Sequence, residues 1–240
     1  MIELITFDLD GTLVDTAGEI VEAANLTLVD FGHAAQPRPL IENMIGTGAH
    51  ALMLQLLTRV DPQRQLDRER VLARFELRYA ETAGTVAQPY ADVLASLQRL
   101  RADGVRLACV TNKERRHAQH VLEVTALADC FELLIGGDTL AWKKPDPRVL
   151  QHVIAQFGST PARTAHVGDS AIDLGAARSA GVADWAVPWG YNAGRPIEQD
   201  QPTRLFHSFP QLADHVLALR HADESVRQPQ RNLTADVVGQ

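Results

Sequence analysis

Four groups of polar residues in this sequence could do chemistry, and the first is a pair of aspartates. Asp8-x-Asp10-Gly11-Thr12 comes directly after the apolar segment Ile2–Phe7. Two carboxylates this close repel each other unless a cation lies between them or one of them is protonated. Such a pair suits a hard divalent cation with oxygen ligands, and Mg²⁺ is the usual choice beside phosphate. Gly11 would allow a tight turn whose N–H groups face an anion.

An Asp-x-Asp pair also begins the calcium loop of an EF-hand, which needs glycine at its sixth position and glutamate at its twelfth. Counted from Asp8, the twelfth position holds Glu19, but the sixth holds Leu13. The preceding segment has the pattern of a strand and not of a helix. The sequence therefore disfavours a calcium loop.

The second and third groups follow later apolar segments. Thr111 and Asn112 supply a hydroxyl and backbone amides that could hold phosphoryl oxygens, although a threonine at a strand end often only caps the next helix. Lys144 precedes Pro145 in a stiff loop, where a compact positive charge would be aimed at one place. A solvated surface lysine remains the alternative.

The fourth group is again a pair of acids, in Gly168-Asp169-Ser170-Ala171-Ile172-Asp173. If a helix begins at Ser170, Asp169 lies near its N-terminus and Asp173 lies one turn along, so both could face the strand ends. Alone, the two acids could equally be helix caps that interact with the helix dipole.

The elements that must position these groups alternate between short apolar segments and helical patterns, which is typical of a parallel sheet wrapped by helices. The expected strands are Ile2–Phe7, Val105–Val110, Leu133–Ile135, Thr164–Val167 and Trp185–Val187. The expected helices of this unit are 90–103, 114–127, 146–157 (with Asp146 as N-cap and Pro147 in the first turn) and 170–180. Ligands of such open sheets bind at the carboxyl ends of the strands, where all four groups would meet.

Between the first and second expected strands the alternation stops for about seventy residues. The segments Asp15–Phe31, Ile41–Thr58 and Asp67–Ala83 have apolar residues at helical spacing and no convincing strand. We therefore expect an α/β fold, a Rossmann-like parallel sheet core at 1–15 and 86–220, with an inserted α-helical cap at 16–85. The alternative is that these residues form a long crossover connection with extra helices, packed on the face of the sheet. The polar segment 221–240 is predicted to be a flexible tail.

Composition limits the function classes. The chain has 240 residues, 45% of them hydrophobic, and a net charge of −7, which disfavours nucleic acid and anionic membranes as partners. It has no apolar run of the ~20 residues that span a bilayer, no basic N-terminal leader and two cysteines, so we expect a cytoplasmic protein. Only three of its 23 basic residues are lysines: Lys113, Lys143 and Lys144.

In their order along the chain, the four groups resemble the motifs of the haloacid dehalogenase superfamily of phosphotransferases. The resemblance covers about residues 2–219, and these motifs carry it: Asp8-x-Asp10-Gly11-Thr12, Thr111, Lys144 and Gly168-Asp169-x-x-x-Asp173. The first and the fourth motif are specific for the superfamily. The middle two support the resemblance only because they occur in the same order along the chain.

The resemblance implies a role for each aspartate. Asp8 would be the nucleophile that forms an acyl-phosphate, and Asp10 would protonate the leaving alkoxide and then deprotonate water. Superfamily members that act on carbon–halogen bonds lack an acid at the position of Asp10, so its presence implies an oxygen leaving group. Mg²⁺ would be held by Asp8, Asp10 (through its carbonyl) and Asp169, with Asp173 steadying the site.

The remaining motif residues would bind the phosphoryl group or the substrate. Lys144 and Thr111 would neutralise charge on the phosphoryl group, together with Gly11, Thr12 and the amide near Asn112. The cap lies where the helical-cap subgroup of the superfamily has it. Its loop Met44-Ile45-Gly46-Thr47-Gly48-Ala49 resembles that of phosphoglycolate phosphatases, which implies substrate contacts for Gly46 and Thr47. A purely structural tight turn at the two glycines stays open.

The expected function is Mg²⁺-dependent hydrolysis of a small phosphorylated metabolite, with 2-phosphoglycolate first. The neutral cap loop disfavours a sugar-phosphate mutase, and the absence of lysine before Lys113 disfavours a phosphonate hydrolase. A pyrophosphatase or another small-ester phosphatase is the alternative within this class. A non-catalytic regulator that binds phosphate or Mg²⁺, or a receiver-like phospho-acceptor, is the alternative outside it. The sequence leaves open whether the protein is a monomer or a dimer.

Overall fold

The central sheet has six parallel strands in the order β5-β4-β1-β6-β7-β8. The structure, a computed structural model, describes residues 1–227. The strands are Leu4–Phe7 (β1), Arg106–Val110 (β4), Leu133–Ile135 (β5), Thr164–Gly168 (β6), Ala183–Ala186 (β7) and Arg204–Leu205 (β8). The two-residue β8 is too short for a sequence pattern to predict.

Strand β1 lies in the middle of this sheet and determines where the first motif goes. All four of its residues are buried, and it pairs with β4 on one side and β6 on the other. Ile5 and Phe7 face one hydrophobic cluster, while Leu4 faces another on the opposite side. A parallel strand buried on both faces must be apolar throughout, which is why Leu4–Phe7 could be predicted as a strand.

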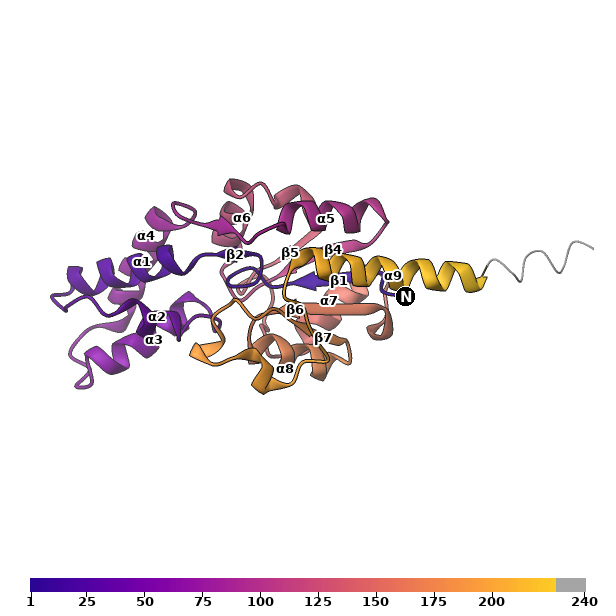
Figure 1. Cartoon of the computed structure of the whole chain (residues 1–240). Helices are drawn as coiled ribbons and strands as arrows, with labels where there is room; N and C mark the ends of the chain where they lie inside the picture. The colour runs from indigo at the N-terminus through magenta and orange to yellow at the C-terminus, as the bar shows by residue number, and fades with distance from the viewer. Residues whose placement is uncertain (228–240) are drawn as a thin grey trace, which may run out of the picture.

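Helices cover both faces of the sheet (Figure 1). One face packs against Val93–Ala102 (α5), Arg115–Val124 (α6) and Phe209–Arg227 (α9). The other face packs against Arg148–Gln156 (α7) and Ala171–Ala180 (α8). Short 3₁₀ turns occur at Ala128–Cys130, Pro161–Arg163, Asn192–Gly194 and Ile197–Asp200. The result is the expected α/β fold with a Rossmann-like core.

Four further helices form a cap at one end of the sheet, drawn in indigo and purple in Figure 1. They are Ala17–Asp30 (α1), Arg38–Glu42 (α2), Ala49–Val60 (α3) and Arg68–Thr82 (α4). The cap has its own hydrophobic cluster, in which Met53 and Phe75 are fully buried. A small antiparallel ribbon, Val14–Asp15 (β2) with Gln88–Pro89 (β3), joins the two chain crossings between cap and core. The domain limits at 15/16 and 85/86 stay a prediction.

Within the cap, the helical pattern expected over Ile41–Thr58 is wrong as one continuous segment. Helix α2 ends at Glu42 and α3 begins at Ala49. Between them Gly46 has φ 120° and Gly48 has φ 98°, values that favour glycine and break a helix. The periodicity misses this break because apolar residues continue through it.

Two other expectations need correction. Helix α7 begins at Arg148, so Pro147 precedes the helix, and Asp146 Oδ1 accepts a hydrogen bond from the Arg148 N–H at 3.0 Å. Helix α9 continues to Arg227, so residues 221–227 of the predicted flexible tail are helical. Residues 228–240 of that tail lie outside the described residues. No helix within residues 1–227 has the length and apolar character needed to cross a membrane.

Candidate active site

Three aspartates from two motifs meet at the carboxyl end of the sheet. Asp8 follows β1 directly, and its N–H donates to Val167 O at 2.9 Å, which fixes it beside β6. Asp8, Asp169 and Asp173 each place a carboxylate oxygen within 4.8 Å of the others, and all three are buried. The topology thus brings together residues that are about 160 positions apart.

Lys144 lies among these carboxylates. Its Nζ is 2.9 Å from Asp8 Oδ1, as an ion pair, and donates to Asp173 Oδ1 at 2.7 Å. Burial alone would lower the pKa of Lys144, but Asp173 and Asp8 outweigh it and raise the pKa, so the ammonium stays charged. One ammonium therefore faces three buried carboxylates.

The pKa values of the aspartates reflect this excess of negative charge. Burial raises the pKa of Asp8 to about 6, against the lowering effect of Lys144. Burial, with Asp173 and Asp8 nearby, raises the pKa of Asp169 as well. The pKa of Asp173 is lowered, because Lys144 and His166 outweigh its burial. Asp8 Oδ1 is buried, and its partner within residues 1–227 is the Lys144 ammonium. A hard divalent cation would balance the excess charge, so the residues fit Mg²⁺.

Asp169 and Asp173 are held in place by surrounding donors. Thr12 Oγ1 donates to Asp169 Oδ1 at 3.0 Å, and the Tyr191 N–H donates to Asp169 Oδ2 at 2.7 Å. Both Ser170 N (3.1 Å) and Ser170 Oγ (2.6 Å) donate to Asp173 Oδ2, at the start of α8. Asp173 therefore combines a helix-capping role with its place in the cluster.

Gly11 and Thr12 lie in the site, but their donors are already used. The Gly11 N–H donates to Val14 O at 2.9 Å and the Thr12 N–H to Leu9 O at 3.2 Å. Because the Thr12 hydroxyl also binds Asp169, contact of either residue with a phosphoryl group would require one of these bonds to break. The geometry shows Thr12 as a support for Asp169.

Thr111 and Asn112 directly follow β4, beside the cap loop. Asn112 Nδ2 donates to Gly46 O and to Lys144 O, at 2.9 Å each, and so links the cap loop to the lysine loop. Thr47 Oγ1 is buried and has no hydrogen-bond partner within residues 1–227, and Thr47 O accepts a hydrogen bond from Lys143 Nζ at 2.8 Å. The structure therefore brings both predicted cap residues against the core.

Asp10 is held by two residues whose importance the sequence reasoning missed. Asp10 Oδ1 accepts hydrogen bonds from Thr16 Oγ1 at 2.7 Å and from Lys113 Nζ at 2.9 Å. Lys113 is buried and also lies 3.5 Å from Glu19 Oε1, on the first cap helix. The scarcity of lysine in the chain was the signal that could have singled out Lys113.

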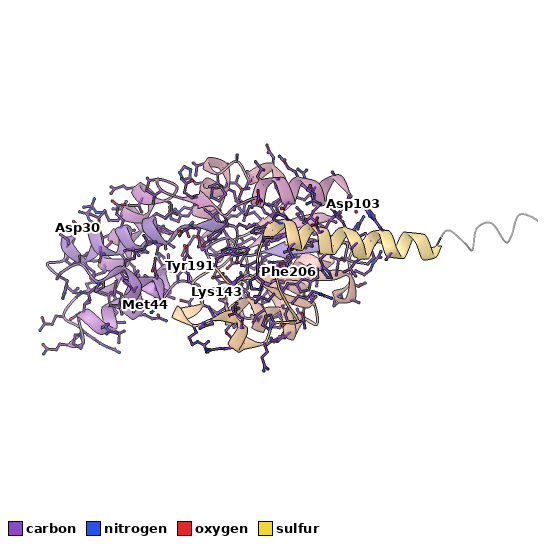
Figure 2. All side chains as sticks on the ribbon, viewed as in Figure 1. Asp30, Met44, Asp103, Lys143, Tyr191 and Phe206 are labelled. Atoms are coloured by element: carbon purple, nitrogen blue, oxygen red, sulfur yellow. The ribbon has the colours of Figure 1, made fainter. Side chains whose placement is uncertain are left out.

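Tyr191 makes specific polar contacts where the cap joins the core. Its hydroxyl donates to Asp15 Oδ1 at 2.8 Å and accepts from the N–H groups of Thr16 and Ala17, at 3.0 Å each. Figure 2 shows Tyr191 and Lys143 where the cap meets the sheet. Tyr191 thus connects the start of the first cap helix to Asp169, which its own N–H binds.

The cap lies over the site, and between cap and core is a partly open cavity of about 20 Å³, which is room for about one water molecule. The core lines it with Asp8, Asp10, Thr111, Asn112 and Lys113, and the cap lines it with Ile20, Ile45, Gly46, Gly48, Ala49, Leu52 and Tyr79. Asp8, Asp10 and the cap loop therefore border one small pocket.

Comparison with known proteins agrees with this geometry. The family model described as haloacid dehalogenase-like hydrolase matches residues 5–187. A phosphoglycolate phosphatase of Thiobacillus denitrificans is 37% identical over 224 residues, covering 92% of this chain and 97% of that protein. A plasmid-encoded phosphoglycolate phosphatase of Cupriavidus necator is 41% identical over 187 residues, covering 78% and 81%.

A solved structure also shows similarity to phosphoglycolate phosphatases. The crystal structure of a predicted phosphoglycolate phosphatase from Haemophilus somnus 129PT superimposes with a TM-score of 0.84 at 30% identity, covering 90% of this chain and 98% of that one. Family model, relatives and fold agree with the site built from the four motifs. The chain belongs to the haloacid dehalogenase-like hydrolase family and is a phosphatase.

Proposed function

We propose that this phosphatase hydrolyses small phosphate monoesters, 2-phosphoglycolate first among them, through a phosphoaspartate at Asp8. The observation that supports it most is that Asp8 and Asp10 line one small cavity while Lys144 lies against Asp8. A nucleophile, an acid–base group and a cation are thus close together at one place. That combination is what displacement at phosphorus requires.

In the first half-reaction an Asp8 carboxylate oxygen forms a bond to phosphorus, and the bond from phosphorus to the ester oxygen breaks. Asp10 donates its proton to the departing alkoxide. Because Thr16 and Lys113 hold Oδ1 of Asp10, its Oδ2 is the oxygen left to carry that proton. In the second half-reaction Asp10 takes a proton from water as the water attacks phosphorus and releases Asp8.

The surrounding residues would neutralise the negative charge of the phosphoryl group during transfer. Lys144 stays protonated beside Asp8 and is placed to neutralise a phosphoryl oxygen, and the Thr111 hydroxyl lies on the same cavity wall. Asp8, Asp169 and the carbonyl of Asp10 would hold Mg²⁺, with Asp173 in support. When bound, the ion supplies positive charge that offsets the carboxylates and the phosphoryl oxygens.

The choice of 2-phosphoglycolate rests on the names of the relatives and on the cavity. Two relatives at 37% and 41% identity are phosphoglycolate phosphatases. The cavity is small, and its cap wall is largely apolar. A two-carbon leaving group suits such a space better than a polyol, whose hydroxyls would lose hydrogen bonds to water there.

A substrate panel tests the proposal. We expect kcat/KM for 2-phosphoglycolate to exceed that for pyrophosphate and for sugar phosphates at equal Mg²⁺. We also expect EDTA to abolish hydrolysis of p-nitrophenyl phosphate and added Mg²⁺ to restore it. A kcat/KM for 2-phosphoglycolate among the lowest of the panel would rule it out as the preferred substrate. Hydrolysis that survives both EDTA and the Asp8→Asn substitution would rule out the proposed mechanism.

A further inference from the structure

We propose that Lys113 and Tyr79 form the binding site for the carboxylate group of the substrate. The inference rests on the proposed function and narrows it, since it requires a leaving group that is both small and anionic. The two side chains line the same cavity as Asp8 and Asp10. Lys113 comes from the core, after β4, and Tyr79 comes from cap helix α4.

Lys113 is the one cation among the residues that line the cavity in the described part of the chain. Its ammonium has three N–H donors. One donates to Asp10 Oδ1 at 2.9 Å and a second to Glu19 Oε1 at 3.5 Å. The other oxygen of Glu19 accepts from the Gly84 N–H at 2.7 Å. The third donor of Lys113 lies on the side of Tyr79, and a ligand oxygen between the two side chains would accept from both.

Tyr79 offers a second donor to the same place. It is 1% exposed, and among the described residues its hydroxyl makes no hydrogen bond of good geometry, with the Lys113 ammonium as its polar neighbour. The ring is fixed between Phe75, with ring centroids 5.6 Å apart, and His117, at 4.5 Å. The Lys113 ammonium lies 5.0 Å from the centre of the Tyr79 ring. A buried hydroxyl without a partner is unfavourable, and a ligand oxygen would satisfy it.

The rest of the cap wall limits the size and polarity of the ligand. Ile20, Ile45 and Leu52 are apolar side chains of that wall and offer no hydrogen bond to a hydroxyl group. A longer or hydroxylated leaving group would leave polar atoms unpaired there. The structure therefore selects a short acid, with its carboxylate at Lys113 and Tyr79 and its phosphoryl group at Asp8.

The test compares 2-phosphoglycolate with 2-phosphoglycolamide, which has the same shape and no carboxylate charge. The readout is the ratio of kcat/KM for the acid to that for the amide, so that general losses of activity cancel. We expect Tyr79→Phe and Lys113→Gln each to lower this ratio by about tenfold or more, the size of a lost hydrogen bond to a charged group. Tyr90→Phe is the matched control, because Tyr90 packs on Trp189 outside the cavity, and its ratio should equal that of the wild type.

A binding experiment separates recognition from chemistry and from folding. In an Asp8→Asn background, calorimetry at fixed Mg²⁺ should show the same loss of preference for the acid when Tyr79→Phe is added, and thermal melting reports whether each variant is folded. If the acid-to-amide ratio is unchanged in both Tyr79→Phe and Lys113→Gln, the inference is overturned. The proposed function still stands in that case, provided that the wild type hydrolyses 2-phosphoglycolate. A fall in Lys113→Gln alone overturns the assignment of Tyr79.

Two results concern the substrate class itself. If the wild type hydrolyses neither the acid nor the amide but does hydrolyse p-nitrophenyl phosphate, the proposed substrate fails, and the carboxylate site fails with it. If pyrophosphate is the better substrate and loses the same factor in Tyr79→Phe, the site recognises a phosphate group and the carboxylate assignment is overturned.

Discussion

At the scale of single residues, the site is controlled by an imbalance of buried charge. Asp8, Asp169 and Asp173 are buried together, and Lys144 is the ammonium that contacts two of them. A buried carboxylate without a counter-charge is costly, so the protein depends on Lys144 when no metal ion is bound. Stability and catalysis are therefore linked at this residue.

Lys144→Met should destabilise the metal-free protein. Removing one partner of a buried ion pair typically costs about 3–5 kcal/mol, because the remaining charges stay buried. We expect urea unfolding in EDTA to show a loss of this size, and Mg²⁺ to recover more stability in the variant than in the wild type. Lys143→Met is the control, since Lys143 is exposed and donates only to Thr47 O. Equal stability of Lys144→Met and wild type in EDTA would contradict this account.

Asp10→Asn should affect substrates according to their leaving group. Asparagine cannot donate the proton that an alkoxide needs, and general acid catalysis contributes about 10²–10⁴-fold. We expect kcat/KM for 2-phosphoglycolate to fall by about that factor, and that for p-nitrophenyl phosphate to fall much less, since nitrophenolate leaves without a proton. Equal losses with the two substrates would argue against the acid role of Asp10.

At the scale of elements, loops without regular structure set the positions of the side chains that would bind Mg²⁺. Gly190 follows β7, and a Cβ atom placed there would lie 2.1 Å from Asp169 Oδ2. The same loop brings the Tyr191 N–H to that oxygen. The close approach of this loop to Asp169 therefore requires glycine at position 190.

Gly190→Ala should weaken Mg²⁺ binding. The added methyl group must displace Asp169, and so we expect the Mg²⁺ concentration for half-maximal activity to rise by tenfold or more, on the order expected when the support of a metal ligand is lost. Gly175→Ala is the control, because its Cβ would lie at an ordinary 3.5 Å from Pro145 Cβ. An unchanged Mg²⁺ requirement in Gly190→Ala would show that the loop does not set the ligand position.

At the scale of the whole molecule, cap and core are joined by polar contacts as well as by the ribbon of β2 and β3. Glu76 on α4 interacts with His117 Nε2 at 2.7 Å and with Arg116, both on α6 of the core, and with His50 Nε2 at 2.7 Å on α3. Burial would raise the pKa of Glu76, but hydrogen bonds from His117, Arg116 and His50 outweigh it and lower the pKa to about 2.

The contribution of Glu76 to stability should follow its ionisation. Because the folded pKa is below the usual value of 4.5, the contribution is present above pH 4.5 and is lost as the pH falls toward 2. We expect Glu76→Gln to be less stable than wild type in urea unfolding at pH 6, and the difference to shrink as the pH is lowered through 4.5. Glu81→Gln, on the exposed side of α4, is the control. A difference that is independent of pH would contradict the role of the charge.

The sequence predicted those parts of the molecule that depend on local pattern. Buried strands such as Leu4–Phe7 are apolar throughout, and the motif residues follow them, so the α/β fold and the meeting of Asp8 with Asp169 could be predicted. The contacts of Lys113, Tyr79 and Glu76 could not, because they depend on how the cap is seated on the core. No spacing along the chain encodes that arrangement.

Asp8 is the proposed acceptor of the phosphoryl group of 2-phosphoglycolate. The most direct test is acid quenching of a reaction with Mg²⁺ and 2-phosphoglycolate that carries ³²P, followed by peptide mapping of the labelled protein. We expect label on the peptide that contains Asp8, at a level that depends on Mg²⁺, and none in Asp8→Asn. Release of phosphate at the normal rate without labelled protein, and by Asp8→Asn as well, would contradict it.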